Sequence, residues 1–345
     1  MAKEKKKEFD YSAELKKLKT LGPERVYLLS GEEDYLREQF IAEIRKLCLG
    51  GEEDFNYRRL DGTALDMNVL AEAVDAVPFL AERTVVEVRD FDINHCRDKD
   101  AEQLKKLLSD VPDTCTLLFV IHPDYEMDGR LSAVRIVKQY ACSVDFAAQG
   151  GGVLFNWINR RFAAQGKKIS RQDMEYLIFV GGTLMNQLIP EIEKLCAGTS
   201  GDTVTRADID ALVRRLPDAQ VFDMLDDLSM GKKDAAAAAL AQLLAMSEEP
   251  SKLLSMVGMQ VRRLFAVKLA QLENCGRNET LELVGVRYDF IVDKLRQSAK
   301  RYSFPQIGKM LDLCAEYDYK MKRVPVDKTE LLKELFMRIA EGVTC

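Results

Sequence analysis

An apolar run, Cys115 to Ile121 (CTLLFVI), limits the fold of this chain more than any other feature of its sequence. A strand with water on one face alternates apolar and polar residues, whereas a strand covered on both faces is apolar almost throughout. Such coverage is typical of parallel sheets, because helices pack on both faces of the sheet. We therefore predict a buried strand here, within a sheet that helices cover.

The residues before this run alternate between short apolar segments and helical patterns. Strands are predicted at Val26 to Leu29, Phe55 to Leu60 and Thr84 to Val88, and helices at Tyr11 to Leu21, Tyr35 to Leu49, Asp66 to Val77 and Ala101 to Leu108. Strands and helices in alternation are typical of an α/β domain with a mainly parallel sheet. We place this domain at residues 21–147, after a polar tail and first helix at residues 1–20.

The sequence after Gly150 lacks strand patterns, and glycines separate its helical segments. We predict a small helical domain at residues 148–216. After Pro217 the helical pattern continues almost to the end, with Asp234 before an alanine-rich helix and Pro250 at the start of a long one. A third, all-helical domain is therefore expected at residues 217–345, and a chain of 345 residues is long enough for this division.

The loop after the first strand lies where a nucleotide-hydrolysing α/β domain holds its phosphates. It lacks the GxxxxGK[ST] pattern, in which backbone N–H groups and a lysine bind the phosphates. Three consecutive carboxylates, which would repel ATP, stand there instead; the degenerate loop comprises Ser30, Gly31, Glu32, Glu33 and Asp34. We expect these acids to favour the N-terminus of the following helix. ATP hydrolysis at this loop is not expected.

No other pattern in the sequence indicates catalysis, a metal site or a cofactor. His95 and His122 have no metal-ligand spacing, and the eight cysteines are scattered without a CxxC pair, so we expect reduced thiols. Every apolar run is far shorter than the roughly 18 residues of a membrane helix, so we expect a cytoplasmic protein without membrane contact. With a formal net charge of −6, any contact with nucleic acid needs a local basic face.

Several segments resemble one known family. VYLLSGEEDYLREQ (26–39) is similar to the opening of the delta subunits of bacterial replicative clamp loaders, in which a degenerate loop replaces the phosphate-binding motif. VDAVPFLAERTVVEVRDF (74–91) resembles the family's helix, apolar-aromatic turn and strand, and GGTLMNQLIPEIEKLCAG (181–198) resembles its second domain. Further similar segments are VFDMLDDL, EEPSKLLSMVGMQVRRLF and VRYDFIVDKLRQSAKRYS, so the resemblance covers nearly the whole chain after the polar tail.

The resemblance implies an AAA+-like fold, with a parallel-sheet domain that has a degenerate phosphate loop, a small helical lid domain and a helical C-terminal collar domain for oligomerisation. It implies a subunit that binds and opens the beta sliding clamp, so that the ring can be loaded on primed DNA during chromosomal replication. The implied partners are that clamp, the ATPase (gamma/tau) and delta-prime subunits, and primed DNA through the assembled complex, at the replisome of the nucleoid. The complex is part of a DNA-directed DNA polymerase, a nucleotidyltransferase, but neither catalysis nor a cofactor is implied for this subunit itself.

The family's clamp contact is an apolar pair at the turn after a helix, which corresponds here to Phe79 and Leu80, preceded by Val77 and Pro78. This chain has the order Phe-Leu, where Leu-Phe is common. Exposed apolar residues at such a turn are unusual unless a partner covers them, and aromatic side chains often dominate interfaces. The residues alone leave open another interpretation, in which both side chains belong to the core at the entrance of the strand.

Two features leave a direct contact with DNA open. The third domain carries basic residues, of which Arg262, Arg263, Lys300 and Arg301 are candidates, although such charges usually lie on a solvated helix face. The segment 276–295 has the helix, turn and helix pattern of DNA-reading modules, or is ordinary helix packing. Two alternative functions follow: a DNA-binding regulator that uses this segment, and an active AAA+ ATPase motor subunit of the same complex, which needs the missing phosphate loop.

Overall fold

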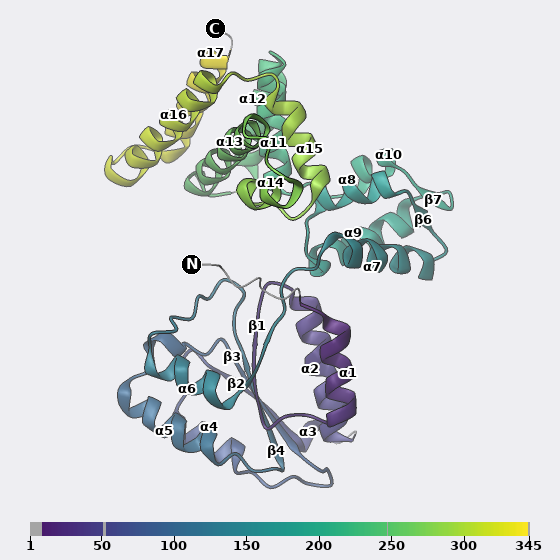
Figure 1. The fold of residues 1–345 in the computed structure, drawn as a ribbon, viewed down its shortest axis with the longest axis vertical. Helices are drawn as coiled ribbons and strands as arrows, with labels where there is room; N and C mark the ends of the chain where they lie inside the picture. Colours follow the sequence, from purple (N-terminus) through teal and green to yellow (C-terminus); the bar gives the residue numbers. More distant parts are fainter. Residues whose placement is uncertain (1–8, 51–52, 247, 344–345) are drawn as a thin grey trace. The chain divides into compact units, whose positions relative to one another are not determined.

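The computed structural model describes residues 9–50, 53–246 and 248–343 (Figure 1). The chain divides into two compact units, and each is described by itself. The first contains Met1–Gln149 together with Leu184–Asn186, and the second contains Gly150–Thr183 and Gln187–Cys345. The predicted polar tail lies mostly outside the described residues. The two expected helical domains fall within one unit, so the boundary between them at residue 217 stays a prediction.

A five-stranded sheet forms the centre of the first unit, in the order β2-β3-β4-β1-β5. Neighbouring strands are all parallel; they are β1 (Val26–Ser30), β2 (Tyr57–Asp61), β3 (Thr84–Arg89), β4 (Cys115–Val120) and β5 (Cys142–Asp145). Every residue of β4 is buried, as expected for its apolar sequence. The predicted α/β fold with a parallel sheet is therefore confirmed.

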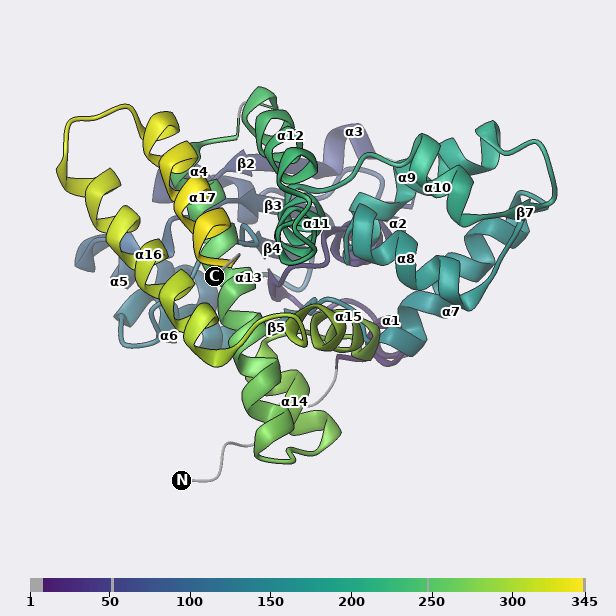
Figure 2. The same cartoon turned by 90° about the horizontal axis from the view of Figure 1, so that it is seen from above.

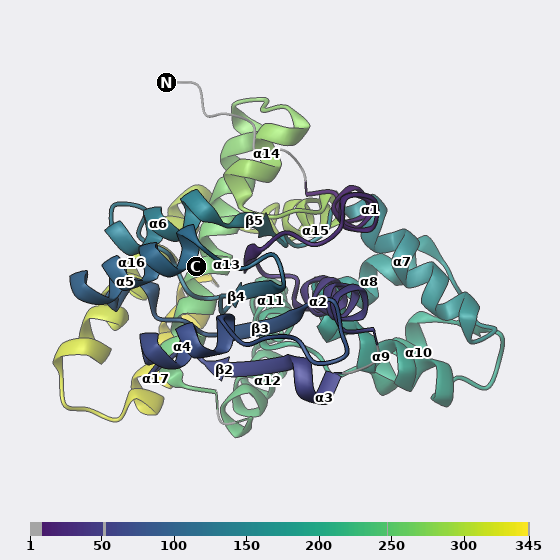
Figure 3. The same cartoon turned by 90° about the horizontal axis from the view of Figure 1, so that it is seen from below.

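Helices cover both faces of this sheet (Figure 1 and Figure 3). On one face lie α1 (Tyr11–Leu21) and α2 (Asp34–Leu49), and on the other lie α4 (Met67–Val74), α5 (Asp98–Ser109) and α6 (Ser132–Tyr140). In α2, the buried residues Phe40, Ile41 and Ile44 recur at helical spacing, and together they give the helix one apolar face. A short 3-10 helix, Ile93–His95, follows β3.

Two local predictions for the first unit are wrong. We expected a strand from Phe55 to Leu60, but Phe55 and Asn56 end a short helix, α3 (Glu53–Asn56), and the strand begins only at Tyr57. We expected a helix from Asp66 to Val77, but Asp66 is the cap that precedes α4, and the helix ends at Val74. Val77 therefore lies in the turn that leads from α4 to β3.

The second unit begins with helices and two very short strands. The helices are α7 (Gly151–Ala164), α8 (Arg171–Gly181), α9 (Met185–Gly198), whose first two residues belong to the first unit, and α10 (Arg206–Leu212). The strands β6 (Lys168–Ile169) and β7 (Thr203–Val204) pair in parallel. Our expectation that strands are absent after Gly150 is wrong, because strands of two residues are too short to produce a periodic apolar pattern.

The rest of the second unit, as far as it is described, is helical (Figure 2). Its helices are α11 (Pro217–Ser229), α12 (Lys233–Ala245), α13 (Pro250–Leu272), α14 (Arg277–Val284), α15 (Asp289–Ala299), α16 (Phe304–Arg323) and α17 (Lys328–Val343). Pro250 starts α13 as predicted, since proline at the first helical position loses no hydrogen bond. Asp234 lies inside the first turn of α12 and not before it.

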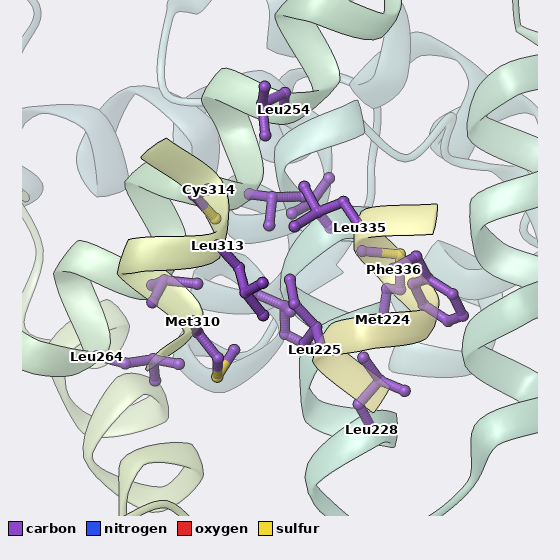
Figure 4. Packing of buried hydrophobic residues seen from close by; sticks show 14 of the residues in the cluster. Met224, Leu225, Leu228, Leu254, Leu264, Met310, Leu313, Cys314, Leu335 and Phe336 are labelled. Atoms are coloured by element: carbon purple, nitrogen blue, oxygen red, sulfur yellow. The ribbon is translucent and has the colours of Figure 1, made fainter. Parts of the chain in front are cut away.

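One apolar core connects these helices (Figure 4). Leu225 of α11, Leu264 of α13, Leu313 of α16 and Leu335 of α17 are all buried in it. Tyr302 is also buried in this core, and its hydroxyl donates a hydrogen bond to the Leu225 carbonyl at 2.6 Å. Apolar side chains from helices far apart in the sequence thus hold this part of the second unit together.

Candidate docking site

The turn between α4 and β3 exposes several apolar side chains. Val77, Phe79 and Leu80 are 87%, 56% and 77% exposed, and Pro78 is half-buried. The interpretation of Phe79 and Leu80 as core residues at the strand entrance is therefore wrong. Apolar side chains that gather on a surface are typical of sites that a partner covers.

Asn56 holds the backbone of this turn. Its Oδ1 accepts a hydrogen bond from the Phe79 N–H at 2.6 Å, and its Nδ2 donates one to the Phe79 carbonyl at 2.7 Å. Because Asn56 is buried, water does not compete for these bonds. The next residue, Leu80, has a φ of 54°, a left-handed conformation that is unfavourable for leucine. The turn therefore has a fixed and strained backbone.

Phe55 adds a second aromatic ring to the exposed group. Its ring and that of Phe79 meet edge to face, with centroids 5.6 Å apart. Phe55 is itself 68% exposed. We call Phe55, Val77, Phe79 and Leu80 together the docking patch. The short helix α3 thus supplies Phe55 to the docking patch. Its Asn56 holds the backbone of Phe79, another residue of the patch.

Polar contacts fix the strand that follows Asn56. The Tyr57 hydroxyl donates a hydrogen bond at 2.8 Å to Glu87, whose side chain is fully buried. Burial, and then this hydrogen bond, raise the pKa of Tyr57 to about 12. Arg89 pairs with Glu87 and also donates two hydrogen bonds to Glu38, at 2.8 and 2.7 Å. The Tyr57–Glu87 bond connects β2 to β3, and the Arg89–Glu38 bonds connect β3 to α2, so the docking patch rests on a well-connected part of the sheet.

The degenerate loop after β1 is occupied by groups of the chain itself. Gly31 has a φ of 111°, and a Cβ atom there would lie 2.5 Å from the Phe146 backbone, so only glycine fits. Glu33 is fully buried, and its carboxylate accepts a hydrogen bond at 3.1 Å from the N–H of Met185, a residue of the same unit. Asp34 lies in the first turn of α2, where a negative charge is favourable. Ser30 ends β1, and Glu32 is exposed.

Arg37 connects this loop to the sheet. The residue is buried in α2, and its guanidinium donates hydrogen bonds to the carbonyls of Gly31 at 3.2 Å and Ile121 at 3.0 Å. It also pairs with Asp34. No pattern in the sequence indicates a role for Arg37 or Asn56, although each binds the backbone of a loop that bears on function.

The four basic candidates for a DNA contact differ in their surroundings. Arg301 pairs with Asp226 of α11, and Arg263 is partly buried, which lowers its pKa. Arg262 on α13 and Lys300 at the end of α15 are exposed. Contact of these residues with DNA stays a prediction.

The segment 276–295 does form two helices, α14 and the start of α15, joined by a turn. Its buried side chains Val284, Val292 and Leu295 pack into the core of the second unit. Arg277 and Asp289, at the starts of the two helices, form an ion pair with Nε and Oδ1 at 2.8 Å. The apolar face of this segment is therefore used for packing within the unit.

Metal-binding and membrane-spanning features are absent from the described part of the chain. Residues 9–50, 53–246 and 248–343 contain no group of three His, Cys, Asp or Glu side chains that could hold a metal ion. In the same ranges no helix has the length and apolar character needed to cross a membrane. The cysteines within them are free thiols, and burial raises the pKa of Cys115 to about 11.

The chain is similar to proteins of one family. Residues 27–147 match the family model of the DNA polymerase III delta subunit, and residues 218–339 match the model of the C-terminal domain of that subunit. The DNA polymerase III subunit delta of Bacillus subtilis is 24% identical over 322 residues, which cover 90% of this chain and 91% of the relative. The probable DNA polymerase III subunit delta of Aquifex aeolicus is 23% identical, over 90% of each chain.

A solved structure has the same fold. The Bacillus subtilis DNA clamp loader delta protein aligns with 96% of this chain and 100% of its own, with a TM-score of 0.54 and 20% identical residues. This likeness agrees with the expected AAA+-like fold, in which a parallel sheet domain is followed by helical domains.

Proposed function

This chain belongs to the family of DNA polymerase III delta subunits, the clamp-loader subunits, and on that premise we propose that it binds the beta sliding clamp and opens the ring. Opening allows the ring to be loaded on primed DNA during chromosomal replication. Membership of the family makes the chain a subunit of the DNA polymerase III complex.

The docking patch is the observation that supports clamp binding. Phe79 and Leu80 are the positions at which the family resemblance expects the clamp contact, with Val77 and Pro78 beside them, and three of the four are exposed apolar side chains. Covering Phe79 and Leu80 with an apolar pocket contributes a few kcal/mol, at about 25 cal/mol per Å² of apolar surface. Aromatic anchors of this kind commonly carry most of the binding free energy of an interface.

Ring opening follows from a difference in affinity. A protein that binds a strained, open interface of the ring more tightly than the closed one shifts the ring towards the open state. The shift cannot exceed the ratio of the two affinities. A rigid turn suits this role, because a turn that adapted to both states would bind them equally and would leave the ring closed.

We assign ATP hydrolysis to the ATPase (gamma/tau) subunits and propose neither catalysis nor a cofactor for this chain. Glu33 of the degenerate loop and Arg37 of the following helix form hydrogen bonds within the chain, and the acids of the loop oppose the binding of phosphate. The helical segment 217–345 serves as the collar that joins these ATPases and the delta-prime subunit. Primed DNA is reached through the assembled complex, in the cytoplasm at the nucleoid.

The two alternative functions have less support. An active ATPase motor needs a lysine and a phosphate cradle in the loop after β1, where this chain has SGEEDYLR. A DNA-binding regulator built on the segment 276–295 leaves the docking patch without a role.

The test is binding to the sliding clamp of the same organism, measured by surface plasmon resonance without nucleotide. We expect wild type to bind, and Phe79→Ala/Leu80→Ala to bind at least about 100-fold more weakly, because interface anchors contribute 2 kcal/mol or more each. The matched control is Leu272→Ala/Leu283→Ala, which removes two apolar side chains that are 64% and 45% exposed in the second unit. Absence of binding by wild type, or equal binding by both double variants, would remove the proposal.

A further inference from the structure

We propose that Asn56 is a positioning residue for the docking patch, and that Phe55 is a third anchor of it beside Phe79 and Leu80. This inference rests on the proposed function, because it concerns how the same surface meets the clamp. The partner surface that fits is an apolar pocket wide enough for two aromatic rings in edge-to-face contact and one aliphatic side chain.

The bonds of Asn56 are specific to an asparagine side chain. The amide acts once as acceptor and once as donor, and both bonds go to the backbone of one residue, Phe79. Two such bonds fix both the position and the direction of the Phe79 backbone. Leucine, which is close to asparagine in size, keeps neither bond, and aspartate keeps the acceptor but places its second carboxylate oxygen opposite the Phe79 carbonyl. Neither side chain can therefore replace the amide of Asn56.

The conformation of Leu80 explains why the turn needs this support. A φ of 54° is unfavourable for leucine, so a free turn would leave this conformation for others. Such relaxation would move the side chains of Phe79 and Leu80 away from the positions that they have in this turn. Because Asn56 binds the residue directly before Leu80, it limits the turn to the conformation that exposes both side chains.

Phe55 is the neighbour of Asn56 in the sequence and is itself part of the docking patch. It precedes Asn56 in α3, it is 68% exposed, and its ring contacts that of Phe79 at 5.6 Å. On the other side of Asn56, Tyr57 is fixed by the buried Glu87 and by the guanidinium of Arg45, which lies 4.2 Å from the centre of its ring. Three consecutive residues thus have three roles: Phe55 is an anchor, Asn56 supports the turn, and Tyr57 connects both to the sheet.

The first test measures clamp binding by surface plasmon resonance for wild type, Asn56→Leu, Asn56→Asp and Phe55→Ala. We expect Asn56→Leu to lower the affinity about tenfold or more, mainly through slower association, because fewer molecules present the turn ready to bind. Asn56→Asp should also lower the affinity, because its buried carboxylate oxygen faces the Phe79 carbonyl without a donor. Phe55→Ala should lower the affinity about fivefold or more, through faster dissociation.

The matched control is Asn94→Leu. Asn94 also binds the backbone of a separate loop in the first unit, since its Nδ2 donates to the Glu126 carbonyl at 2.8 Å and its Oδ1 accepts from the Asp128 N–H at 3.0 Å. These bonds go to residues outside the docking patch, so we expect clamp binding within about twofold of wild type. Equal losses for Asn94→Leu and Asn56→Leu, or no loss for Asn56→Leu, would overturn the positioning role.

A second test does not require the clamp. Chymotrypsin cleaves after exposed aromatic and leucine residues, and its cuts after Phe79 and Leu80 can be followed in the free protein by mass spectrometry. We expect these two cuts to be faster in Asn56→Leu than in wild type or Asn94→Leu, because cleavage follows the population of the opened turn. Unchanged cleavage overturns the role of Asn56 in holding the turn. If wild type does not bind the clamp, the proposed function and the anchor role of Phe55 fail, whereas the cleavage rates still decide what Asn56 does.

Discussion

The guanidinium of Arg37 donates a hydrogen bond to the backbone carbonyl of Ile121 at 3.0 Å, and so connects the helix after the degenerate loop to the end of the central strand. The same group binds the Gly31 carbonyl and pairs with Asp34. In nucleotide-hydrolysing α/β domains this loop holds phosphates. Here the buried guanidinium of Arg37 binds oxygen atoms of the chain itself. This loop therefore has a structural role, and that role can be measured as stability.

We predict that Arg37→Ala lowers the free energy of unfolding of the first unit by about 2–4 kcal/mol, because buried carbonyls and Asp34 lose their partner. Urea unfolding followed by circular dichroism measures this change. The control is Arg130→Ala, since Arg130 is 90% exposed and pairs with Asp128 at the surface; it should change the stability by less than about 0.5 kcal/mol. An Arg37→Ala midpoint equal to that of the control would contradict the prediction.

Leu80→Gly should separate stability from clamp binding. Glycine adopts a φ of 54° without strain, but it also gains freedom in the unfolded chain, so we expect a stability within about 1 kcal/mol of wild type. The loss of an exposed anchor that contributes about 2 kcal/mol should weaken clamp binding about 30-fold. Thermal unfolding and surface plasmon resonance on the same sample provide the two values. A large loss of stability would mean that Leu80 is needed for the fold.

Leu80→Ile complements this variant. Isoleucine keeps the apolar character of leucine, but its branched Cβ makes the left-handed conformation less favourable still. We expect a loss of about 1 kcal/mol in stability and faster chymotrypsin cleavage at Phe79. Cleavage and stability equal to those of wild type would show that the turn is not strained at this residue.

Asp92 should make the first unit sensitive to acid. The Tyr125 hydroxyl donates to its carboxylate at 2.6 Å and His95 lies at 2.9 Å, and these contacts, with the hydroxyl first, lower the pKa of Asp92 below its ordinary value of 3.8. A carboxyl whose pKa is lower in the folded state contributes stability above pH 3.8, and that contribution is lost as the pH falls through the folded value. As the pH falls below 4, Asp92→Asn should therefore lose less stability than wild type. Urea unfolding at each pH measures this loss. Parallel curves for the two proteins would contradict this.

Tyr302→Phe should weaken the core of the helical unit. The Tyr302 hydroxyl is buried and donates to the Leu225 carbonyl, so its removal costs about 1 kcal/mol. Tyr319→Phe removes a hydroxyl from a side chain that is 65% exposed and should leave the stability unchanged. Thermal unfolding compares the two variants, and equal midpoints would show that the hydrogen bond contributes nothing measurable.

The central strands could be predicted from the sequence because strands that are buried on both faces are apolar almost throughout. β4 differs from the predicted Cys115 to Ile121 by one residue, and β1 and β3 begin where their apolar segments begin. β2 was predicted too early, because phenylalanine is enriched in strands and the helical, exposed position of Phe55 is a tertiary property. The two-residue strands β6 and β7 give no periodic signal at all.

The candidate site could be predicted only in part. Family resemblance located Phe79 and Leu80, but composition alone could not distinguish an exposed turn from a strand entrance. The role of Asn56 depends on a contact across 23 positions of the sequence, which no local pattern contains. Arg37 likewise looks like an ordinary charged residue on a helix, and only the path of the chain after β4 brings Ile121 within its reach.

The strand order has a consequence for how the protein is made. β1 has no neighbour next to it in sequence; its partners are β4 and β5, which are synthesised long after it. Contacts between distant segments slow folding, because a long loop must close before any of them forms. The first strand therefore emerges from the ribosome with both edges unpaired and an apolar sequence exposed. We expect the nascent chain to need a chaperone until Asp145 has left the exit tunnel.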